Sequence, residues 1–170
     1  MKNFINAFMG FVLTIWGAMM VVSCDPCASV VCTNGNCSNG TCVCIAGYEK
    51  MGTACVAVNE GYVGTGTITA TVTSVDSNGV SNTTNNVGYT LEQSTTDPFS
   101  FTLKSFANVA GNDIMLTISS TNYDVIPSAT VMTTANKTYT VSGAKTGSQV
   151  QLTLLDTGTQ ITYTIAYTIP

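Results

Sequence analysis

The stretch Cys27–Cys55, CASVVCTNGNCSNGTCVCIAGYEKMGTAC, holds six of the seven cysteines of this 170-residue chain. A segment this short and this poor in large apolar side chains cannot bury enough surface to fold on a hydrophobic core alone. It needs covalent cross-links, which persist in an oxidising compartment. Six cysteines allow fifteen pairings, and their spacing does not choose among them. The six are Cys27, Cys32, Cys37, Cys42, Cys44 and Cys55.

Three local features give this segment a recognisable pattern. Cys42-Val43-Cys44 is a Cys-x-Cys pair, Gly47-Tyr48 is a Gly-aromatic pair ahead of Cys55, and Asn34-Gly35 precedes the third cysteine. In these features residues 27–55 resemble the EGF-like module. The resemblance implies a 1–3, 2–4, 5–6 connectivity, so the expected disulfides are Cys27–Cys37, Cys32–Cys42 and Cys44–Cys55. Calcium-binding members carry an acidic run before the first cysteine and an aromatic residue in the third-to-fourth loop. This chain has neither, so we expect no strong calcium site.

An apolar run lies ahead of the cysteine-rich segment. It extends from Phe4 to about Val22, follows Lys2, and ends in Val21-Val22-Ser23-Cys24. A run of this length just suffices for a membrane-spanning helix, but its position, the leading lysine and the small residues at its end favour a secretory signal. An uncleaved signal anchor with a free Cys24, or ordinary leader cleavage in a eukaryotic secreted protein, are the alternatives.

The end of that run resembles a bacterial lipobox, in which apolar and small residues precede a cysteine. The resemblance implies a lipoprotein signal peptide over 1–23, a lipidated N-terminus over 24–26, and acyl chains on Cys24. Cysteine arithmetic agrees, because seven is odd and six complete the EGF-like pattern. Two or three acyl chains give stable anchoring. We therefore expect a membrane partner, reached through Cys24, and a location at the bacterial outer membrane or cell surface.

Composition excludes several classes of function. The chain has no histidine, only 8% charged residues and a net charge of −4. Nucleic-acid binding requires clustered Lys and Arg, so we expect none. Without histidine there is no Ser/His/Asp or Cys/His catalytic system, and the usual zinc ligand sets are incomplete. No Gly-rich loop opens a helix. We expect no catalytic residue, no metal site, no cofactor and no enzymatic activity.

The remainder of the chain, after a link over 56–62, is predicted to be one antiparallel β domain over 63–170. Apolar and polar residues alternate along it, as in Phe99, Phe101 and Leu103 or in Ile161 to Ile169. Period-two alternation is typical of strands with one buried face. Turn signals separate about eight strands: roughly 64–75, 86–94, 99–107, 113–119, 123–132, 137–144, 148–156 and 159–169.

Short connections between these strands indicate a meander. A meander of eight strands closes naturally into a small barrel, and a two-sheet sandwich is the alternative. The stretches Ser105–Asn108, Val125–Ser128, Tyr139–Gly143 and Ile161–Ile165 resemble, in order and spacing, the lipocalin/calycin-like barrels of lipoproteins from the Bacteroides and Flavobacterium lineages. Several of those lipoproteins also carry an EGF-like module after the lipidated cysteine. The chain departs from the lipocalin pattern in lacking Gly-x-Trp, so a wide, deep cavity is not implied.

These observations favour a non-catalytic surface lipoprotein that binds an extracellular protein or glycan through its Thr/Asn-rich face, with the EGF-like module as a spacer. The alternatives are a carrier of a small apolar ligand inside the barrel and a structural envelope protein. The role of the aromatic residues separates the carrier from the other two hypotheses, because these residues either line a ligand pocket or fill a core. Seven of them are at issue: Tyr89, Phe99, Phe101, Phe106, Tyr139, Tyr163 and Tyr167. The second role is the commoner one for aromatic residues at strand spacing.

Overall fold

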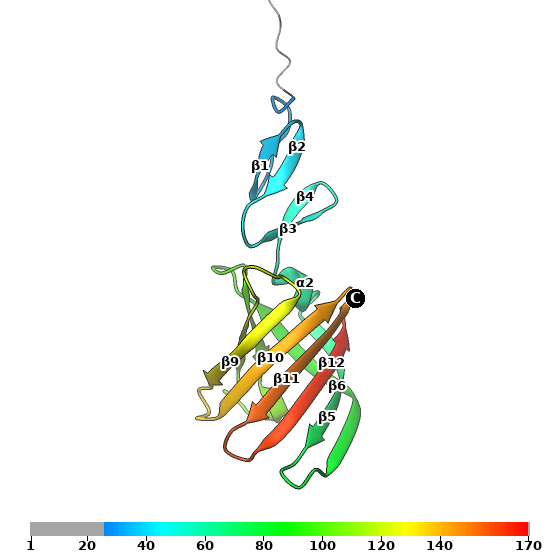
Figure 1. Ribbon diagram of the computed structural model, residues 1–170, viewed down its shortest axis with the longest axis vertical. Coiled ribbons are helices and arrows are strands. Elements are labelled where there is room, and N and C mark those ends of the chain that lie inside the picture. Colours follow the sequence, from blue (N-terminus) through cyan, green and yellow to red (C-terminus); the bar gives the residue numbers. More distant parts are fainter. Residues whose placement is uncertain (1–25, 170) are drawn as a thin grey trace, which may run out of the picture.

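The computed structural model of the protein describes residues 26–169 and is almost entirely β-structure (Figure 1). Two short hairpins form the N-terminal module, and eight strands form the second part. In chain order the elements are β1 (Gly35–Ser38), β2 (Thr41–Cys44), β3 (Tyr48–Met51), β4 (Ala54–Ala57), α2 (Glu60–Val63), β5 (Thr67–Val75), β6 (Ser81–Gln93), β7 (Ser100–Lys104), the 3-10 turn η2 (Phe106–Asn108), β8 (Ile114–Thr117), β9 (Val125–Met132), β10 (Thr138–Thr146), β11 (Gln149–Asp156) and β12 (Ile161–Thr168).

The N-terminal module is built on disulfides. β1 pairs with β2 and β3 pairs with β4, both antiparallel. The three bonds are Cys27–Cys37, Cys32–Cys42 and Cys44–Cys55. This is the connectivity that the EGF-like resemblance implies. Asn34 and Asn39 both have a positive φ, which asparagine tolerates better than most residues do, so the tight loops beside β1 suit its sequence.

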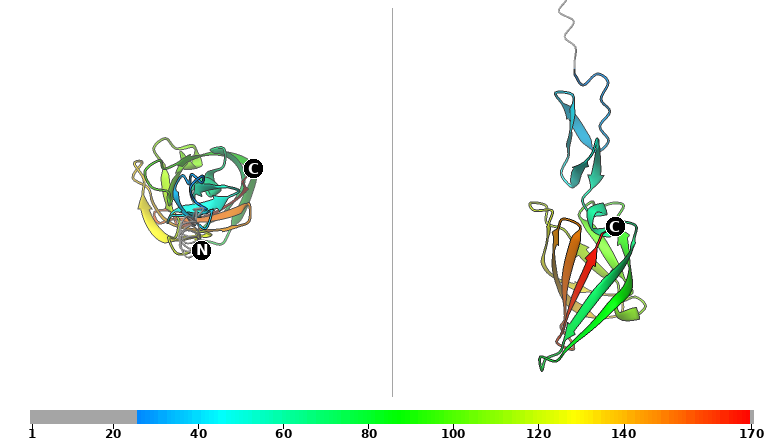
Figure 2. Two further views of the ribbon diagram at one scale, coloured as in Figure 1. Left: turned by 90° about the horizontal axis from the view of Figure 1, so that it is seen from above. Right: turned by 90° about the vertical axis from the view of Figure 1, so that its right-hand side faces the viewer.

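The C-terminal part is an eight-stranded antiparallel barrel that is nearly closed. Its strand order is β8-β7-β6-β5-β12-β11-β10-β9, so the first and last strands of the domain pair with each other. Viewed from above, the strands surround a roughly circular outline (Figure 2). β8 and β9 flank the one seam, which Ser119 N–H bridges at one end by donating to Val125 O at 2.8 Å. The predicted β class and the meander are therefore confirmed, and the meander forms the predicted barrel and not the alternative two-sheet sandwich.

Along the strands of the barrel, every second side chain points inward, as the alternation in the sequence predicts. In β11, Val150, Leu152 and Leu154 are buried, whereas Gln149 and Gln151 are exposed. The same rule holds around the barrel, and the interior consists of Val58, Tyr62, Val63, Ile68, Ala70, Leu91, Phe101, Leu103, Phe106, Ile114, Leu116, Ile118, Ile126, Tyr139, Val141, Val150, Leu152, Leu154, Ile165 and Tyr167. Apolar burial on this scale is the main stabilising term of the barrel.

The observed strands differ from the predicted ranges by one to several residues at their ends, and two of these differences have a clear physical reason. The strand expected over 99–107 ends at Lys104, because Ser105 and Ala107 adopt left-handed backbone conformations in and before η2. The strand expected over 86–94 begins earlier, at Ser81, and forms a long hairpin with β5. Its early residues are uniformly polar, so period-two alternation gave no signal there.

The segment 56–62, expected as a link, includes the end of β4 and most of α2. Val58, Asn59 and Tyr62 are at most 1% exposed. These residues therefore form part of the barrel's interior, at the end that faces the N-terminal module.

Two features expected near the N-terminus, the signal peptide over 1–23 and the lipidation of Cys24, lie outside the described residues. Within 26–169, no helix has the length and apolar character needed to cross a membrane.

Candidate functional site

Side chains fill the barrel interior from end to end. Tyr62 stacks on Phe101 with ring centroids 5.4 Å apart, at the end nearest the module. At the other end, Phe106 meets Tyr139 and Tyr163 edge-on at 5.7 and 5.1 Å. Such offset and edge-to-face pairs are the favourable geometries for aromatic rings. Six of the seven aromatic residues proposed as either lining or core belong to the core or pack against it, and Tyr62, which the sequence placed in the link, belongs with them. The seventh, Phe99, is half-buried and lies against Tyr123 with ring centroids 5.9 Å apart.

A buried asparagine fixes the upper end of the barrel. Asn59 is 0% exposed, and its Nδ2 donates to the carbonyl oxygens of Ser94, Asp97 and Ser100 at 2.8–3.1 Å. Its Oδ1 accepts from Gln93 Nε2 at 2.6 Å. A buried amide whose groups are all satisfied orders the segments that it joins. Asn59 therefore locks α2 to the loop between β6 and β7.

The N-terminal module contacts this end of the barrel directly. Gly47 N–H donates to Tyr123 Oη at 3.2 Å, and Lys145 Nζ lies 3.9 Å from Glu49 and 3.7 Å from Asp124. The same ammonium lies 5.1 Å from the centre of the Tyr62 ring. The Lys145 side chain is only 11% exposed, whereas those of Glu49 and Asp124 are 42% and 63% exposed, so only the lysine end of the contact is desolvated. The module therefore packs against the barrel through specific contacts and is not joined to it by the linking segment alone.

Hydrogen bonds inside the barrel depend on two buried tyrosines. Tyr167 Oη donates to Tyr62 O at 3.0 Å, and Tyr62 Oη donates to Tyr123 O at 2.8 Å. Burial raises the pKa of both phenols well above the usual value, because an ionised phenolate would lose its hydration there. Both tyrosines are therefore neutral donors at physiological pH. Their role is to tie β12, α2 and the 118–124 loop together.

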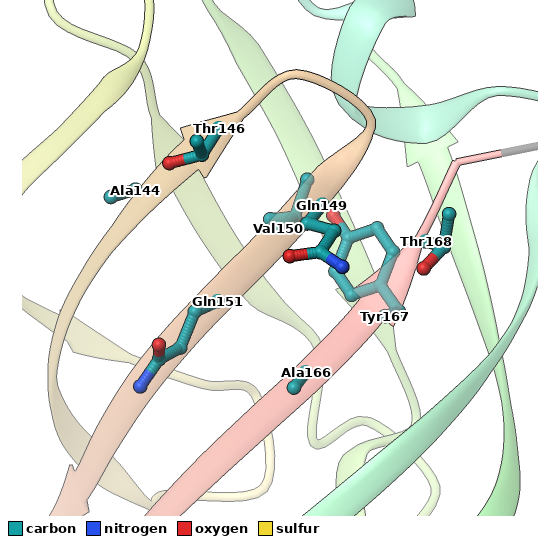
Figure 3. A pocket seen from close by; sticks show the side chains of 8 residues that line it. All are labelled: Ala144, Thr146, Gln149, Val150, Gln151, Ala166, Tyr167 and Thr168. Atoms are coloured by element: carbon teal, nitrogen blue, oxygen red, sulfur yellow. The ribbon is translucent and has the colours of Figure 1, made fainter.

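The surface of the barrel carries two adjoining shallow grooves, of about 300 and 420 Å³. They lie across the outer faces of β10, β11, β12 and β5, and share Ala166, Tyr167 and Thr168. Figure 3 shows Gln149 and Gln151 projecting from β11 and Ala166 on the neighbouring strand β12. Because the alanine side chain is much shorter than those of the glutamines, the surface is lower at Ala166. We call this combined surface the outer groove; its lining is Thr67, Ile68, Thr69, Ala70, Thr71, Asn86, Ala144, Thr146, Gln149, Val150, Gln151, Ala166, Tyr167 and Thr168.

The chemistry of the outer groove is neutral and polar. Its exposed residues are threonines, glutamines, an asparagine and two alanines, and no charged residue lines it. Hydroxyls and amides both donate and accept hydrogen bonds. Such a surface suits an uncharged polar partner, whereas an ionic ligand would find no counter-charge. Nothing in the lining supplies a nucleophile activated by a base.

Most carboxylates of the described region lie in turns or in ion pairs with lysines, as Glu92 and Asp113 do with Lys104. Asp76 Oδ1 accepts from the N–H groups of Asn78 and Val80 at 2.9 and 2.8 Å and so closes Asp76–Gly79 as a hairpin turn. Asp156 does the same for Gly158 and Thr159. Within residues 26–169, no three of His, Cys, Asp and Glu come together as a metal-binding group.

One surface ion pair shifts the pKa values of its members. Lys104 contacts Asp113 and also lies 3.3 Å from Glu92. The Lys104 ammonium and the Ser105 N–H lower the pKa of Asp113, and the same pairing raises the pKa of Lys104. These residues lie outside the outer groove, so they bear on stability rather than on recognition.

Sequence reasoning located the disulfide cysteines but not the outer groove. The groove residues are the exposed members of strands whose buried members were recognised, for example Gln151 beside Leu152. Their one signal was the run of small and amide side chains on the outward positions of β11 and β12. That these strands lie beside β5, far away in the sequence, follows only from barrel closure.

No protein-family model matches the chain, and no curated protein matches it.

Proposed function

We propose that this chain is a lipid-anchored, non-enzymatic surface protein of a bacterial outer membrane that binds an uncharged extracellular partner through the outer groove. Lipid on Cys24 supplies the anchor, and the EGF-like module acts as a spacer that raises the barrel above the membrane. The partner is a glycan or a polar protein surface.

The observation that carries the binding role is the contrast between the inside and the outside of the barrel. The interior is filled by apolar and aromatic side chains, with Phe101, Leu103, Leu152 and Ile165 all 0% exposed. Ligand sites are usually concave surfaces with a few polar groups. On this barrel the outer groove offers such groups on the outside, and a rigid sheet holds them in place.

The packed interior argues against the alternative of a carrier for an apolar ligand. A carrier needs a cavity large enough for its cargo, whereas Tyr62 and Phe106 occupy the two ends of the barrel as core residues. Loading a ligand would require several of these side chains to leave. Recognition on the outer surface requires no such rearrangement.

The contact between module and barrel supports the spacer role. The Gly47–Tyr123 hydrogen bond and the Lys145 ion pairs fix the module on the barrel end opposite the β5–β6 turn. With an anchor at Cys24, the strands of the barrel would lie beyond the module, away from the membrane. The outer groove would then face the surroundings of the cell.

Cell fractionation tests the anchor. We expect the wild-type chain in the outer-membrane fraction with radiolabelled fatty acid attached, and a Cys24→Ser variant without label and released from the membrane. A matched control that retains Cys24, Ser23→Ala, keeps both label and location, since alanine remains a small residue before the cysteine. Equal labelling of the wild type and Cys24→Ser would contradict the anchor.

A pair of surface variants tests the groove. Ala166→Arg fills the shared part of the outer groove and introduces a charge, whereas Ala129→Arg makes the same change at an exposed position of β9 outside it. On an array of neutral oligosaccharides and on whole cells of neighbouring species, we expect wild-type binding to survive Ala129→Arg and to fall at least about tenfold with Ala166→Arg. Equal binding by both variants would place recognition elsewhere.

A further inference from the structure

Strand β6 is much longer than the strand that covers its outer edge. It has 13 residues, whereas β7 has five. β7 pairs with β6 only over Thr90–Gln93, while β5 pairs with β6 from Ser81 to Thr90. Within residues 26–169, the part of β6 from Ser81 to Gly88 thus has a partner strand on one side only. This overhang projects beyond the barrel in Figure 1.

The geometry of the hairpin shows which backbone groups are free. Asp76 N–H donates to Val80 O at 3.1 Å, which fixes Asp76 and Val80 as a hydrogen-bonded pair. Antiparallel pairing then alternates, so Asn82 and Thr84 direct their N–H and C=O groups toward β5. Ser81 and Thr83 direct theirs away from it. The chain cannot satisfy these groups with β7, because Ser105 turns in the left-handed region directly after that strand ends.

The overhang lacks the devices that usually protect an edge. Natural edges are blunted by lysine, proline or inward charges. Here the sequence Ser81-Asn82-Thr83-Thr84 contains none of these, and all four residues are exposed. The first protective feature is the register shift that follows Thr84, where Asn86 has φ of +58° and twists the strand. An unprotected stretch of four residues, together with the hairpin turn, is therefore open to pairing.

We propose that the β6 overhang pairs with the same segment of a second copy of this chain, in an antiparallel strand-to-strand contact. A twofold axis through such a pair sets each residue of the segment against a residue of the identical segment. A charged edge would place like charges opposite one another, which is destabilising. The neutral Ser, Asn and Thr side chains avoid that repulsion and can bond across the pair, as Thr73 and Thr83 already do within the hairpin at 3.1 Å.

The alternative occupant, an extended peptide from another protein, fits this edge less well. Strand addition gains its specificity from pockets that accept alternate side chains of the peptide. Both faces of the overhang are exposed from Ser81 to Asn86, so no neighbouring element walls such pockets. A second copy needs no pocket because its own sequence supplies the match. This proposal does not depend on the outer groove or on the anchor.

Sedimentation equilibrium of the full chain in density-matched detergent tests the contact. Thr83→Pro removes an N–H that faces away from β5 and leaves the β5–β6 bonds intact. Thr83→Ala shortens the same side chain but keeps the N–H. We expect the wild type and Thr83→Ala to form a reversible dimer, and Thr83→Pro to dimerise about tenfold more weakly.

A second variant keeps the test meaningful if proline disturbs the hairpin. Thr83→Lys preserves the backbone and sets two positive charges close to the twofold axis, so we again expect a weaker dimer, with the defect reduced at high salt. Dimerisation of Thr83→Pro or Thr83→Lys at the wild-type level would overturn the proposal. So would a wild-type chain that stays monomeric throughout, which would leave the edge to a foreign peptide.

Discussion

The N-terminal module and the barrel reach stability by opposite routes. In the module, Cys55 is the one apolar side chain of residues 26–57 that is buried, at 6% exposure, and Val31, Val43 and Met51 are more than half exposed. In the barrel, twenty residues from Val58 to Tyr167 share one interior. A chain too short to bury a core substitutes covalent loops, each of which limits the freedom of the unfolded state. The chain thus combines a disulfide-stabilised module with a barrel built on a hydrophobic core, and Gly47 lies at the contact between them.

Reduction of the disulfides should produce the largest difference in stability between the module and the barrel. Each bond contributes about 2–4 kcal/mol, and the module has little else to hold it. We expect reduced and alkylated protein to lose the dispersed amide NMR signals of residues 27–55 while those of β5–β12 persist. Untreated protein alkylated under the same conditions is the control. Loss of both sets of signals together would mean that the barrel depends on the module for its fold.

A core truncation should act on the barrel alone. Leu152 is 0% exposed, so Leu152→Ala removes buried methyl groups and leaves a cavity, at a cost of about 2–5 kcal/mol. Its neighbour Gln151 points outward, and Gln151→Ala should change stability by less than about 0.5 kcal/mol. Urea denaturation followed by circular dichroism measures both. Similar losses in the two variants would contradict the assignment of inner and outer faces.

The junction can be tested with two glycines that both have a positive φ. A Cβ on Gly47 would lie 2.5 Å from Pro98 Cγ, whereas a Cβ on Gly52 would meet nothing within 4 Å. Gly52→Ala should therefore cost only the backbone strain, about 1 kcal/mol. Gly47→Ala should cost about 1–3 kcal/mol more because it overpacks the contact between module and barrel.

Chemical-shift differences distinguish the two glycine variants further. Gly47→Ala should shift the signals of Pro98, Phe99 and Tyr123 across the junction, and Gly52→Ala should leave them unchanged. If the two variants lose equal stability, the module does not press on the barrel at Gly47.

Surface charge should matter least to either part. Because Lys104 lowers the pKa of Asp113, the folded state holds this carboxylate ionised at a pH where the unfolded chain takes up a proton. The stabilisation is present above the unfolded value and is lost as the pH falls through the folded value. Asp113→Asn should therefore slightly lower the melting temperature at neutral pH and flatten its decline in acid. Thr95→Ala, a distant exposed substitution, should leave the acid decline unchanged.

Much of this fold could be predicted from the sequence because its strands are specified by patterns among residues that are close together in the chain. Alternation of Val150, Leu152 and Leu154 with Gln149 and Gln151 identifies both a strand and its buried face. The polar start of β6 carries no such signal, since neither face of the overhang is buried. The burial of residues in segment 56–62 could not be predicted for another reason. Tyr62 and Asn59 are buried by strands distant in sequence, and no local pattern in the sequence predicts their burial.

The candidate site was harder to predict than the fold. The outer groove forms where β12 pairs with β5, so that Ala166 comes to lie opposite Thr71 across a sequence separation that spans most of the domain. Closure of the meander predicts this pairing in general terms but not its register. The low floor at Ala166 depends on that register.

Native mass spectrometry of the protein extracted from its own membrane tests the lipid anchor and the packed barrel in one experiment. We expect a chain that begins at Cys24, is heavier by two or three acyl chains, is lighter by six hydrogens for the three disulfides, and carries no small apolar ligand. A full-length chain without acyl mass would contradict the lipid anchor. A retained apolar molecule would contradict the packed barrel and favour a carrier.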